Sequence, residues 1–375
     1  MGFFKKKHIN LIEQLDTIAS KIYFKESPYN KYTYIFRNKP FSNTPLSDLP
    51  TNVRQSFSAY NDIEQEEYFA EIEGTNYLEP TTGLIFDKKL KTYYSCSIPY
   101  NYLERKPSFL KIKLRLHKIL KFDTVISIRY YFQNYWHFFN DVLGQLSLID
   151  EKGISSSTPI IIPDGVLHIS FIKQIIDSNA TLKNRNWVEL KRGTLIQANR
   201  IIVAKNLPNT KLNFTRVLGL MQISSFEASP NTTAERKIFL KRGPSRVRSL
   251  SNSLEIAKIA VKFGLEIIDN DTLSFEEQRN IFANASLVVG IHGAGLTNLI
   301  FRFPKTLELV EIFPKNLIPP HYYWLSHQLN FGYNCIIGED EIENSFFLNP
   351  KIFEDSLKRL ESKGPLYFNN DANTL

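Results

Sequence analysis

The fold of this chain is decided by one stretch, Leu287-Val288-Val289-Gly290-Ile291-His292-Gly293-Ala294-Gly295-Leu296-Thr297-Asn298. It begins with a β-branched apolar run, which is typical of a buried parallel strand. Glycines then bracket a histidine, and glycine lets the backbone turn sharply or approach a ligand closely. Ligands of open α/β sheets bind beyond the carboxyl ends of the strands, so His292 lies at the position of a ligand-binding or catalytic residue in such a fold. Backbone N–H groups opening the next helix would suit phosphate.

This stretch alone does not decide between a site and an ordinary turn. It matches neither the dinucleotide pattern G-x-G-x-x-G nor the phosphate-binding pattern G-x-x-x-x-G-K-[ST]. A tight turn from strand to helix, with a locally hydrogen-bonded histidine, explains it equally well. Other parts of the sequence are needed to choose between a ligand site and an ordinary turn.

The composition indicates a globular chain with excess positive charge. At 375 residues the chain exceeds what one hydrophobic core usually serves, which predicts two domains. Lys and Arg outnumber Asp and Glu by 46 to 38, giving a net charge of +8. Such an excess suits nucleic acid, an anionic membrane or a phosphate-bearing substrate. Basic and acidic residues alternate along most of the chain without a known nucleic-acid motif, so no nucleic-acid partner is expected.

The cysteines and the N-terminal sequence favour a cytoplasmic location. Cys96 and Cys335 fit no metal-ligand spacing, and two free thiols are preferred over one disulfide. Neither a secretory signal nor an apolar run of membrane-spanning length is expected. Residues 9–24 have the spacing of an amphipathic helix. Packing on the body of the protein is preferred over contact with an anionic membrane, because Glu13 and Asp16 share the polar face.

Two series of alternating strands and helices follow the N-terminal region. The first has strands predicted at 124–128, 159–163 and 200–204, with helices at 135–149 and 166–178. The second has strands at 237–240, 265–268, 287–291 and 306–312, with helices at 252–263 and 274–283, and a last helix is predicted at 349–362. Residues 26–60 are interpreted as extended or loop, 67–104 as short strands, and 205–233 as the passage between the two series.

These series predict an α/β fold with two Rossmann-like halves facing across a cleft and a mixed N-terminal extension. The expected divisions are a helix and extended segment at 1–66, a first domain at 67–215, a second at 216–345, and a C-terminal helix and tail at 346–375.

The first candidate constellation is Asn134-Tyr135-Trp136-His137-Phe138-Phe139-Asn140-Asp141. On a helix, His137 and Asp141 share a face. The carboxylate can orient the imidazole, raise its pKa or itself act as the base. A structural pair on an aromatic, buried helix is the alternative.

The second candidate is a basic loop, Lys241-Arg242-Gly243-Pro244-Ser245-Arg246-Val247-Arg248, directly after a predicted strand. Guanidinium groups match phosphate oxygens in pairs, so Arg242 and Arg248 are candidates to hold phosphate. Asn252 is expected to cap the following helix.

The third candidate joins the opening histidine turn to Glu311 on the next strand. A carboxylate there can accept two ribose hydroxyls, as acidic residues do in dinucleotide sites. A salt bridge to a neighbouring cation is the alternative.

The order of these groups resembles glycosyltransferase family 61, which includes plant xylan arabinosyl- and xylosyltransferases, animal secretory O-GlcNAc transferases and bacterial polysaccharide enzymes. The resemblance rests on Tyr135-Trp136-His137-Phe138-Phe139-Asn140-Asp141-Val142-Leu143, Lys241-Arg242, Arg248, Asn252, Ser274-Phe275-Glu276-Glu277-Gln278, Ala285, the run from Val289 to Phe301, Glu311 and Pro314. The chain departs from the family's Asp-x-Leu-Pro-Arg-Leu helix at Gly144-Gln145-Leu146.

The resemblance implies a GT-B arrangement and inverting transfer of a sugar from a nucleotide-sugar donor, with UDP as the expected nucleotide. The first domain would bind the acceptor and the second the donor. Asp141 is the expected base and His137 the second choice. The expected donor-binding residues are Arg242, Arg248, Asn252, His292, Gly293, Ala294, Gly295, Leu296, Asn298 and Glu311. We read no Asp-x-Asp pair at the end of a predicted strand, so arginines and backbone amides would neutralise the diphosphate without a metal or other cofactor.

The function expected from this family is therefore transfer of a sugar to a saccharide or lipid-linked acceptor in capsule, O-antigen or related surface polysaccharide synthesis of a bacterium. The alternative is a protein of the same fold that binds a nucleotide or glycan without turnover.

Overall fold

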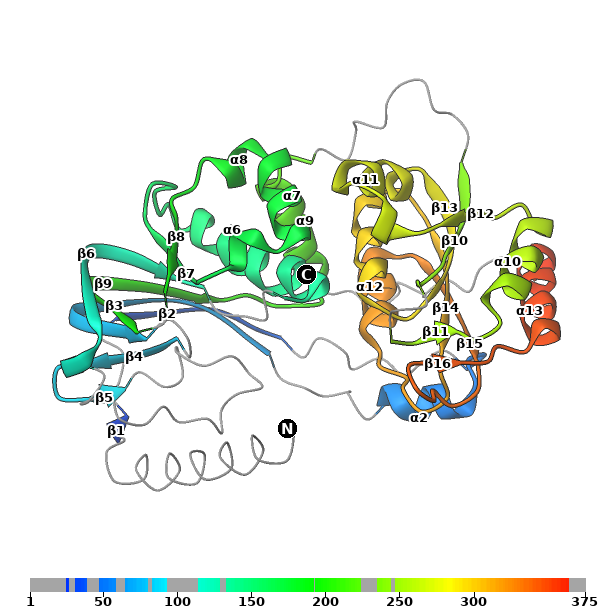
Figure 1. Ribbon diagram of the computed structural model, residues 1–375, viewed down its shortest axis with the longest axis horizontal. Helices are drawn as coiled ribbons and strands as arrows, with labels where there is room; N and C mark the ends of the chain where they lie inside the picture. Colours follow the sequence, from blue (N-terminus) through cyan, green and yellow to red (C-terminus); the bar gives the residue numbers. More distant parts are fainter. Residues whose placement is uncertain are drawn as a thin grey trace. The chain divides into compact units, whose positions relative to one another are not determined.

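The computed structural model describes residues 25–26, 31–38, 47–58, 65–79, 83–92, 114–128, 133–191, 193–223, 235–243 and 247–363 (Figure 1). The chain forms two compact units. Unit 1 comprises Met1–Arg37 and Glu66–Asn206, and unit 2 comprises Asn38–Gln65 and Leu207–Leu375. The predicted amphipathic helix at 9–24 and Cys96 lie outside the described residues.

Unit 1 contains a nine-stranded mixed sheet. Its strands are β1 (Lys25–Glu26), β2 (Lys31–Asn38), β3 (Gln65–Glu79), β4 (Leu84–Asp87), β5 (Lys91–Thr92), β6 (Lys118–Ser127), β7 (Ile160–Pro163), β8 (Trp187–Leu190) and β9 (Thr194–Lys205). Its helices are α5 (Tyr135–His137), η1 (Phe138–Leu143), α6 (Gly144–Glu151), η2 (Val166–His168), α7 (Ser170–Ser178) and α8 (Ala180–Lys183).

The parallel part of this sheet has the order β9-β6-β7-β8, and β3 and β4 extend it in antiparallel fashion. Register is set by β-branched runs: Ile126 pairs with Ile160 on one side and with Ile202 on the other. Ile161 and Ile201 point into a core shared by the strands. Strands buried in this way read as continuous apolar runs, which is why the sequence predicted them.

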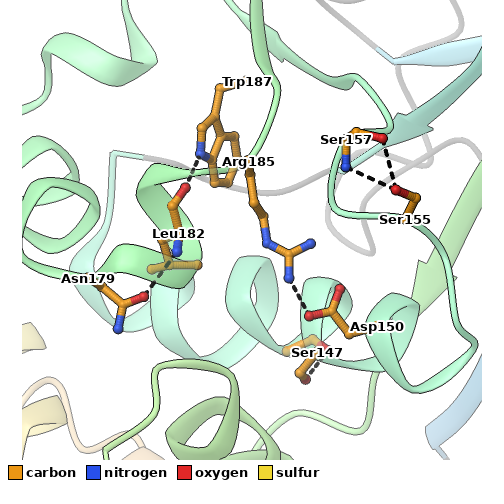
Figure 2. A network of polar contacts seen from close by, with 9 residues as sticks. Ser147, Asp150, Ser155, Ser157, Asn179, Leu182, Arg185 and Trp187 are labelled. Carbon is orange, nitrogen blue, oxygen red and sulfur yellow. Dashed lines mark hydrogen bonds and ion pairs between the residues drawn. The ribbon is translucent and has the colours of Figure 1, made fainter.

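One continuous helical stretch, α5–η1–α6, follows β6. Its central turn, η1, is a π-helix, and all six of its residues are buried. Behind it, Arg185 forms an ion pair with Asp150 of α6, and the Trp187 indole donates to the Leu182 carbonyl over 2.8 Å (Figure 2). The buried guanidinium of Arg185 is thereby matched by a carboxylate, as a buried charge requires.

Unit 2 contains a five-stranded parallel sheet and a two-stranded one. Its strands are β10 (Arg236–Leu240), β11 (Ser249–Leu250), β12 (Glu266–Ile268), β13 (Ala285–Ile291), β14 (Glu308–Phe313), β15 (Gly332–Ile337) and β16 (Ser345–Phe346). Its helices are α2 (Thr51–Ser58), α9 (Lys211–Leu220), α10 (Ser253–Lys262), η3 (Asn270–Thr272), α11 (Phe275–Ala283), η4 (Ala294–Arg302), α12 (His321–Leu329) and α13 (Pro350–Lys363).

The larger sheet of unit 2 has the order β12-β10-β13-β14-β15. Numbered along the chain, this is the doubly wound order 2-1-3-4-5. Helices α10 and α13 cover one face, and α11 and α12 cover the other (Figure 1). On the α10/α13 face, Val289 and Val310 pack with Ile256 and Phe353 in one core. The predicted class, α/β with parallel strands in each half, is confirmed.

Two segments differ from their prediction as loops. Helix α2 lies in the region 26–60, because Val53 and Phe57 are four residues apart and both face the core of unit 2. The Ser56 hydroxyl also donates to the Ile318 carbonyl over 2.6 Å. Helix α9 lies in the predicted passage 205–233, with Thr210 as its N-cap.

The predicted divisions also differ from the units. The region 1–66 is shared between the two units, the boundary before unit 2 falls at Asn206 rather than at 215, and α13 is part of the core of unit 2. No helix in the described part of the chain is long and apolar enough to cross a membrane.

Candidate functional site

The carboxyl ends of β10 and β13 form the point of unit 2 where the strand order reverses. The two strands are neighbours, with Leu240 paired to Gly290. The chain leaves β10 toward β12 and α10, whereas it leaves β13 toward β14 on the other side. Open α/β sheets bind their ligands at such a switch point. Arg242 is the second residue after β10 and His292 the first after β13, so the structure brings these two predicted residues together.

Arg242 is held against the histidine turn. Its Nη1 donates to the His292 carbonyl oxygen over 3.0 Å. A Cβ atom at Gly293 would lie 1.5 Å from that same Nη1. Gly293 has φ 165°, which is extended backbone that any residue adopts. The glycine is therefore needed for the space that the guanidinium occupies, not for its own conformation.

Gly290 and Gly295 also leave space that a neighbouring side chain occupies. A Cβ at Gly290 would meet Leu296 at 2.9 Å, and one at Gly295 would meet the Asn270 amide nitrogen at 2.9 Å. Asn270 was not predicted as a site residue. Its Oδ1 is buried and has no hydrogen-bond partner among the described residues. Its place just beyond the strand predicted at 265–268 was a signal that sequence reasoning could have used.

His292 and Glu311 form a buried pair. Nδ1 of His292 lies 2.5 Å from Oε1 of Glu311, and the Tyr333 hydroxyl donates to Oε2 over 2.7 Å. The Glu311 side chain is 0% exposed. It therefore has no surface to offer the ribose hydroxyls that the sequence analysis assigned to it, and it positions His292 instead.

Burial sets the protonation of this pair. It raises the pKa of Glu311 well above the ordinary value of 4.5, against the opposing effects of the Tyr333 hydrogen bond and the Arg248 charge. Burial, together with the charges of Arg248 and Arg242, holds the pKa of His292 well below 6.5. Both directions favour an uncharged imidazole beside an uncharged carboxylic acid.

Aromatic rings enclose His292. Phe313 stacks on it with ring centroids 5.2 Å apart, and the ring of Tyr322 lies at 5.5 Å. The ring of His321 is stacked at 6.1 Å, at the start of α12. Sequence reasoning missed His321 and Tyr333, because neither α12 nor β15 was among the predicted elements.

Arg248 is the second predicted cation of the site. It has the left-handed φ of 62°, which is uncommon for a residue with a side chain. Its backbone N–H donates to Oε1 of Glu341 over 2.8 Å, which holds the turn in place. Its positive charge lowers the pKa of both His292 and Glu311. Residues 244–246 of the basic loop lie outside the described residues.

Three predicted donor-binding residues have structural partners. Asn252 stands at the N-cap position of α10 without capping it; its side chain bonds the backbone of Leu348 in both directions, over 2.9 and 3.2 Å. The Asn298 amide donates to Gln278 over 2.9 Å, and Leu296 is fully buried. Leu296 and Asn298 lie in η4, which is a 3-10 helix, and Ala294 and Gly295 at its start keep some exposed surface.

The interpretation that no Asp-x-Asp pair ends a strand is wrong. Asp269 and Asp271 directly follow β12. Asp269 pairs with the Lys241 ammonium over 3.3 Å, and its Oδ1 accepts from the Asp271 backbone over 3.1 Å. Within the described ranges, no three His, Cys, Asp or Glu side chains gather closely enough to hold a metal ion.

In unit 1, the predicted pair is formed at the carboxyl end of β6. Nδ1 of His137 lies 2.9 Å from Oδ2 of Asp141. The histidine side chain is 27% exposed and the aspartate 7%. Burial raises the pKa of Asp141, while the hydrogen bond to His137 and its charge lower it. Asn134 caps the helix by accepting from the His137 and Trp136 backbone.

The neighbouring parallel strand β9 ends beside this helix. Asn206, the residue after β9, donates from its amide to the Asn140 carbonyl over 2.7 Å. The His137–Asp141 pair therefore lies at the shared carboxyl end of β6 and β9, again where an α/β sheet binds its ligands.

Comparison with known proteins supports the resemblance found in the sequence. The profile of the family described as glycosyltransferase 61 matches residues 135–309, a range that contains His137, Asp141, Arg242 and His292 but ends before Glu311. The β-1,2-xylosyltransferase RCN11 of rice (Oryza sativa subsp. japonica) is 36% identical over 64 residues. That match covers 17% of this chain and 12% of the rice protein.

Two solved structures share a distant likeness. The Escherichia coli heptosyltransferase WaaC with ADP is 9% identical, with 65% of this chain and 99% of that chain covered and a TM-score of 0.30. The iron-containing dodecameric glycosyltransferase TibC of enterotoxigenic E. coli is 10% identical, with 66% and 75% covered and a TM-score of 0.27. Residues 135–309 of the chain are thus similar to the glycosyltransferase 61 family.

Proposed function

We propose that this protein is an inverting glycosyltransferase that moves a sugar from a nucleotide-sugar donor to a saccharide acceptor. The donor would be bound at the switch point of unit 2, and UDP is the nucleotide to test first. The proposal includes metal independence and a GT-B arrangement. It is supported by the family match and by the two sites at the carboxyl ends of parallel strands.

The observation that carries the proposal is the seating of Arg242 on Gly293. A guanidinium fixed at a switch point can take two phosphate oxygens in its planar fork. Arg248 adds a second positive charge there. Two positive charges there would stabilise the charge that a departing diphosphate develops, and such stabilisation is the largest single effect in many enzymes.

Calorimetric titration with UDP, GDP, ADP and CDP tests the donor site. Replacing Arg242 by Ala should weaken binding of the preferred nucleoside diphosphate by about 10- to 100-fold, the loss expected for hydrogen bonds to a charged group. Arg236→Ala is the matched control, because this arginine begins the same strand and pairs with Glu266. Equal affinity in wild type and Arg242→Ala would remove the donor from this place.

Turnover is measured as release of the nucleoside diphosphate from a nucleotide sugar in the presence of acceptor extract. Metal independence predicts equal rates with EDTA and with added Mg²⁺ or Mn²⁺. Binding without any release would favour the alternative function, a protein that holds a nucleotide or glycan without turnover.

For the base we favour His137, with Asp141 as its orienting carboxylate, which reverses the order expected from the sequence. Asp141 accepts from Nδ1 and is the less exposed of the two. This geometry fixes the tautomer in which Nε2 can remove the proton of the acceptor hydroxyl, as in a catalytic triad. The hydroxyl oxygen would then attack the sugar on the face opposite the diphosphate, which inverts the anomeric centre.

The base assignment predicts that His137→Ala lowers kcat by about 10²- to 10⁴-fold while nucleoside diphosphate affinity stays unchanged. Asp141→Asn should lower kcat as well, because the amide leaves the imidazole in the wrong tautomer. His168→Ala, in η2 of the same unit, serves as the control. If His137→Ala keeps normal turnover, the base is another group.

The setting we propose is surface polysaccharide synthesis, such as capsule or O-antigen, in the cytoplasm of a bacterium. A lipid-linked acceptor would agree with the basic N-terminal sequence, which suits an anionic membrane. Flotation with anionic liposomes, before and after deletion of residues 1–24, tests this contact.

A further inference from the structure

The short contact between His292 and Glu311 determines where the protons of this pair lie. The atoms Nδ1 and Oε1 are 2.5 Å apart, and a contact this short requires a proton between them. With Glu311 as the acid, it donates to Nδ1 and the imidazole keeps its own proton on Nε2. Nε2 has no hydrogen-bond partner among the residues that the structure describes, so it is the atom left to meet a ligand.

Charged and titratable groups face this pair from every neighbouring element. They are Arg242 after β10, Arg248 before β11, His321 and Tyr322 of α12, and Tyr333 and Cys335 of β15. The two arginines disfavour a third positive charge on His292. A diphosphate bound to those arginines would cancel this effect and attract a positive charge to the imidazole.

We propose that Glu311 stores a proton that moves to His292 when diphosphate charge develops in the donor site. The Oε1–H bond of Glu311 breaks and an Nδ1–H bond forms, giving an imidazolium and a carboxylate. The imidazolium donates from Nε2 to a phosphate oxygen, and Tyr333 donates to the new carboxylate. The proton returns to Glu311 when the product leaves, so none is exchanged with water. Glu311 is a positioning residue, and this inference rests on the proposed donor site.

The proton balance of binding tests the proposal. Nucleoside diphosphate (UDP, or whichever of GDP, ADP and CDP binds best) is titrated calorimetrically at pH 6 to 8 in buffers of different ionisation enthalpy. Wild type should take up no proton beyond that of the nucleotide itself. In Glu311→Gln the amide cannot supply the proton, so His292 must take one from the buffer. Affinity of this variant should fall with rising pH by up to tenfold per unit relative to wild type.

Two further variants make the result decisive. Glu308→Gln removes another buried carboxyl group of the same strand and should behave as wild type. Glu311→Asp retains an acid and should restore wild-type proton balance, which a purely structural role would not predict. Equal proton uptake in wild type and Glu311→Gln, or uptake of an extra proton by wild type, would overturn the proposal. If Glu311→Gln does not fold, the ¹⁵N chemical shifts of the His292 ring in wild type decide instead. They should change from those of a neutral imidazole to those of an imidazolium when the nucleoside diphosphate binds, and unchanged shifts would overturn the proposal. Absence of binding by all four nucleotides would instead overturn the donor site.

Discussion

Gly293 shows how a single missing side chain determines a site. The sequence predicted that this glycine lets the backbone approach a ligand, but the group that approaches it is the Arg242 guanidinium. The glycine would affect ligand binding indirectly, because the space it leaves determines the position of the Arg242 guanidinium. A methyl group would displace the arginine although the backbone itself tolerates alanine.

We therefore predict that Gly293→Ala weakens nucleoside diphosphate binding about as much as Arg242→Ala does. The double variant should be no weaker than either single one, because both changes remove the same interaction. Calorimetry on the four proteins forms the cycle. Gly219→Ala is the control: this glycine in α9 has no neighbour within 4 Å of the added methyl group. Additive losses would show that Gly293 has a role separate from Arg242.

Glu308 gives a pH dependence of stability with a defined sign. Burial raises its pKa from 4.5 to about 8, although the Asn334 amide donates to it over 2.7 Å. The folded protein thus holds this proton more tightly than the unfolded chain does. Stability is highest below pH 4.5 with respect to this group and decreases as the pH rises to about 8.

Urea unfolding followed by circular dichroism at pH 5.5 and 8.5 measures this effect. Glu308→Gln should lose less stability between the two pH values than wild type, by about 1.4 kcal/mol for each unit of pKa shift that it removes. An identical pH dependence in the two proteins would mean that Glu308 titrates normally.

The site residues differed in how far the sequence could predict them. Arg242 and His292 follow apolar strands, and the ends of parallel strands meet at one place, so their proximity was predictable. The role of Glu311 was not, because it depends on the hydroxyl of Tyr333, which a later strand supplies. Asn252 and Asn298 were assigned to the ligand, but their amides bond the protein itself.

At the scale of elements, helix α2 supports the site from a distant part of the sequence. The Phe57 ring lies 4.7 Å from that of Tyr323, 6.3 Å from that of Tyr333 and 6.5 Å from that of Phe313. Two of these partners touch the His292–Glu311 pair, since Tyr333 donates to Glu311 and Phe313 stacks on His292. Packing by α2 therefore supports the side chains that surround the His292–Glu311 pair.

Phe57→Ala should lower the free energy of unfolding of unit 2 by about 3 to 5 kcal/mol, the usual loss for a buried phenylalanine. Urea unfolding followed by tryptophan fluorescence, with Trp324 reporting on α12, measures the loss. The exposed neighbour Gln55 provides the control, and Gln55→Ala should stay within about 0.5 kcal/mol of wild type. Equal stability of Phe57→Ala and wild type would contradict this packing.

The π-helical turn η1 was beyond the reach of sequence patterns. The spacing of His137 and Asp141 predicted that they share a face, which is confirmed by their 2.9 Å contact. The apolar periodicity of 135–149 predicted one ordinary helix, whereas six residues form a π turn. Such turns occur frequently at functional sites, but no residue pattern in the chain signals them.

At the scale of the whole molecule, the strands of both sheets were largely predictable and their arrangement was not. Runs such as Pro159-Ile160-Ile161-Ile162-Pro163 identify buried strands by composition alone. The order 2-1-3-4-5 depends on which face each helix covers, and that is a property of packing. Asn38–Gln65 belongs to unit 2, where the ring of Phe57 packs against the rings of Phe313 and Tyr333, more than 250 residues later in the chain.

Unit 2 is built from two segments, Asn38–Gln65 and Leu207–Leu375, which the ribosome synthesises at different times. Helix α2 is translated before the strands of unit 2 that cover it, and Glu66–Asn206 of unit 1 is translated in between. At roughly 5 to 20 residues per second, Phe57 waits on the order of ten seconds or longer for Phe313. During that time the apolar face formed by Val53 and Phe57 has no partner strands to cover it, so we expect it to be prone to premature collapse onto the strands of unit 1.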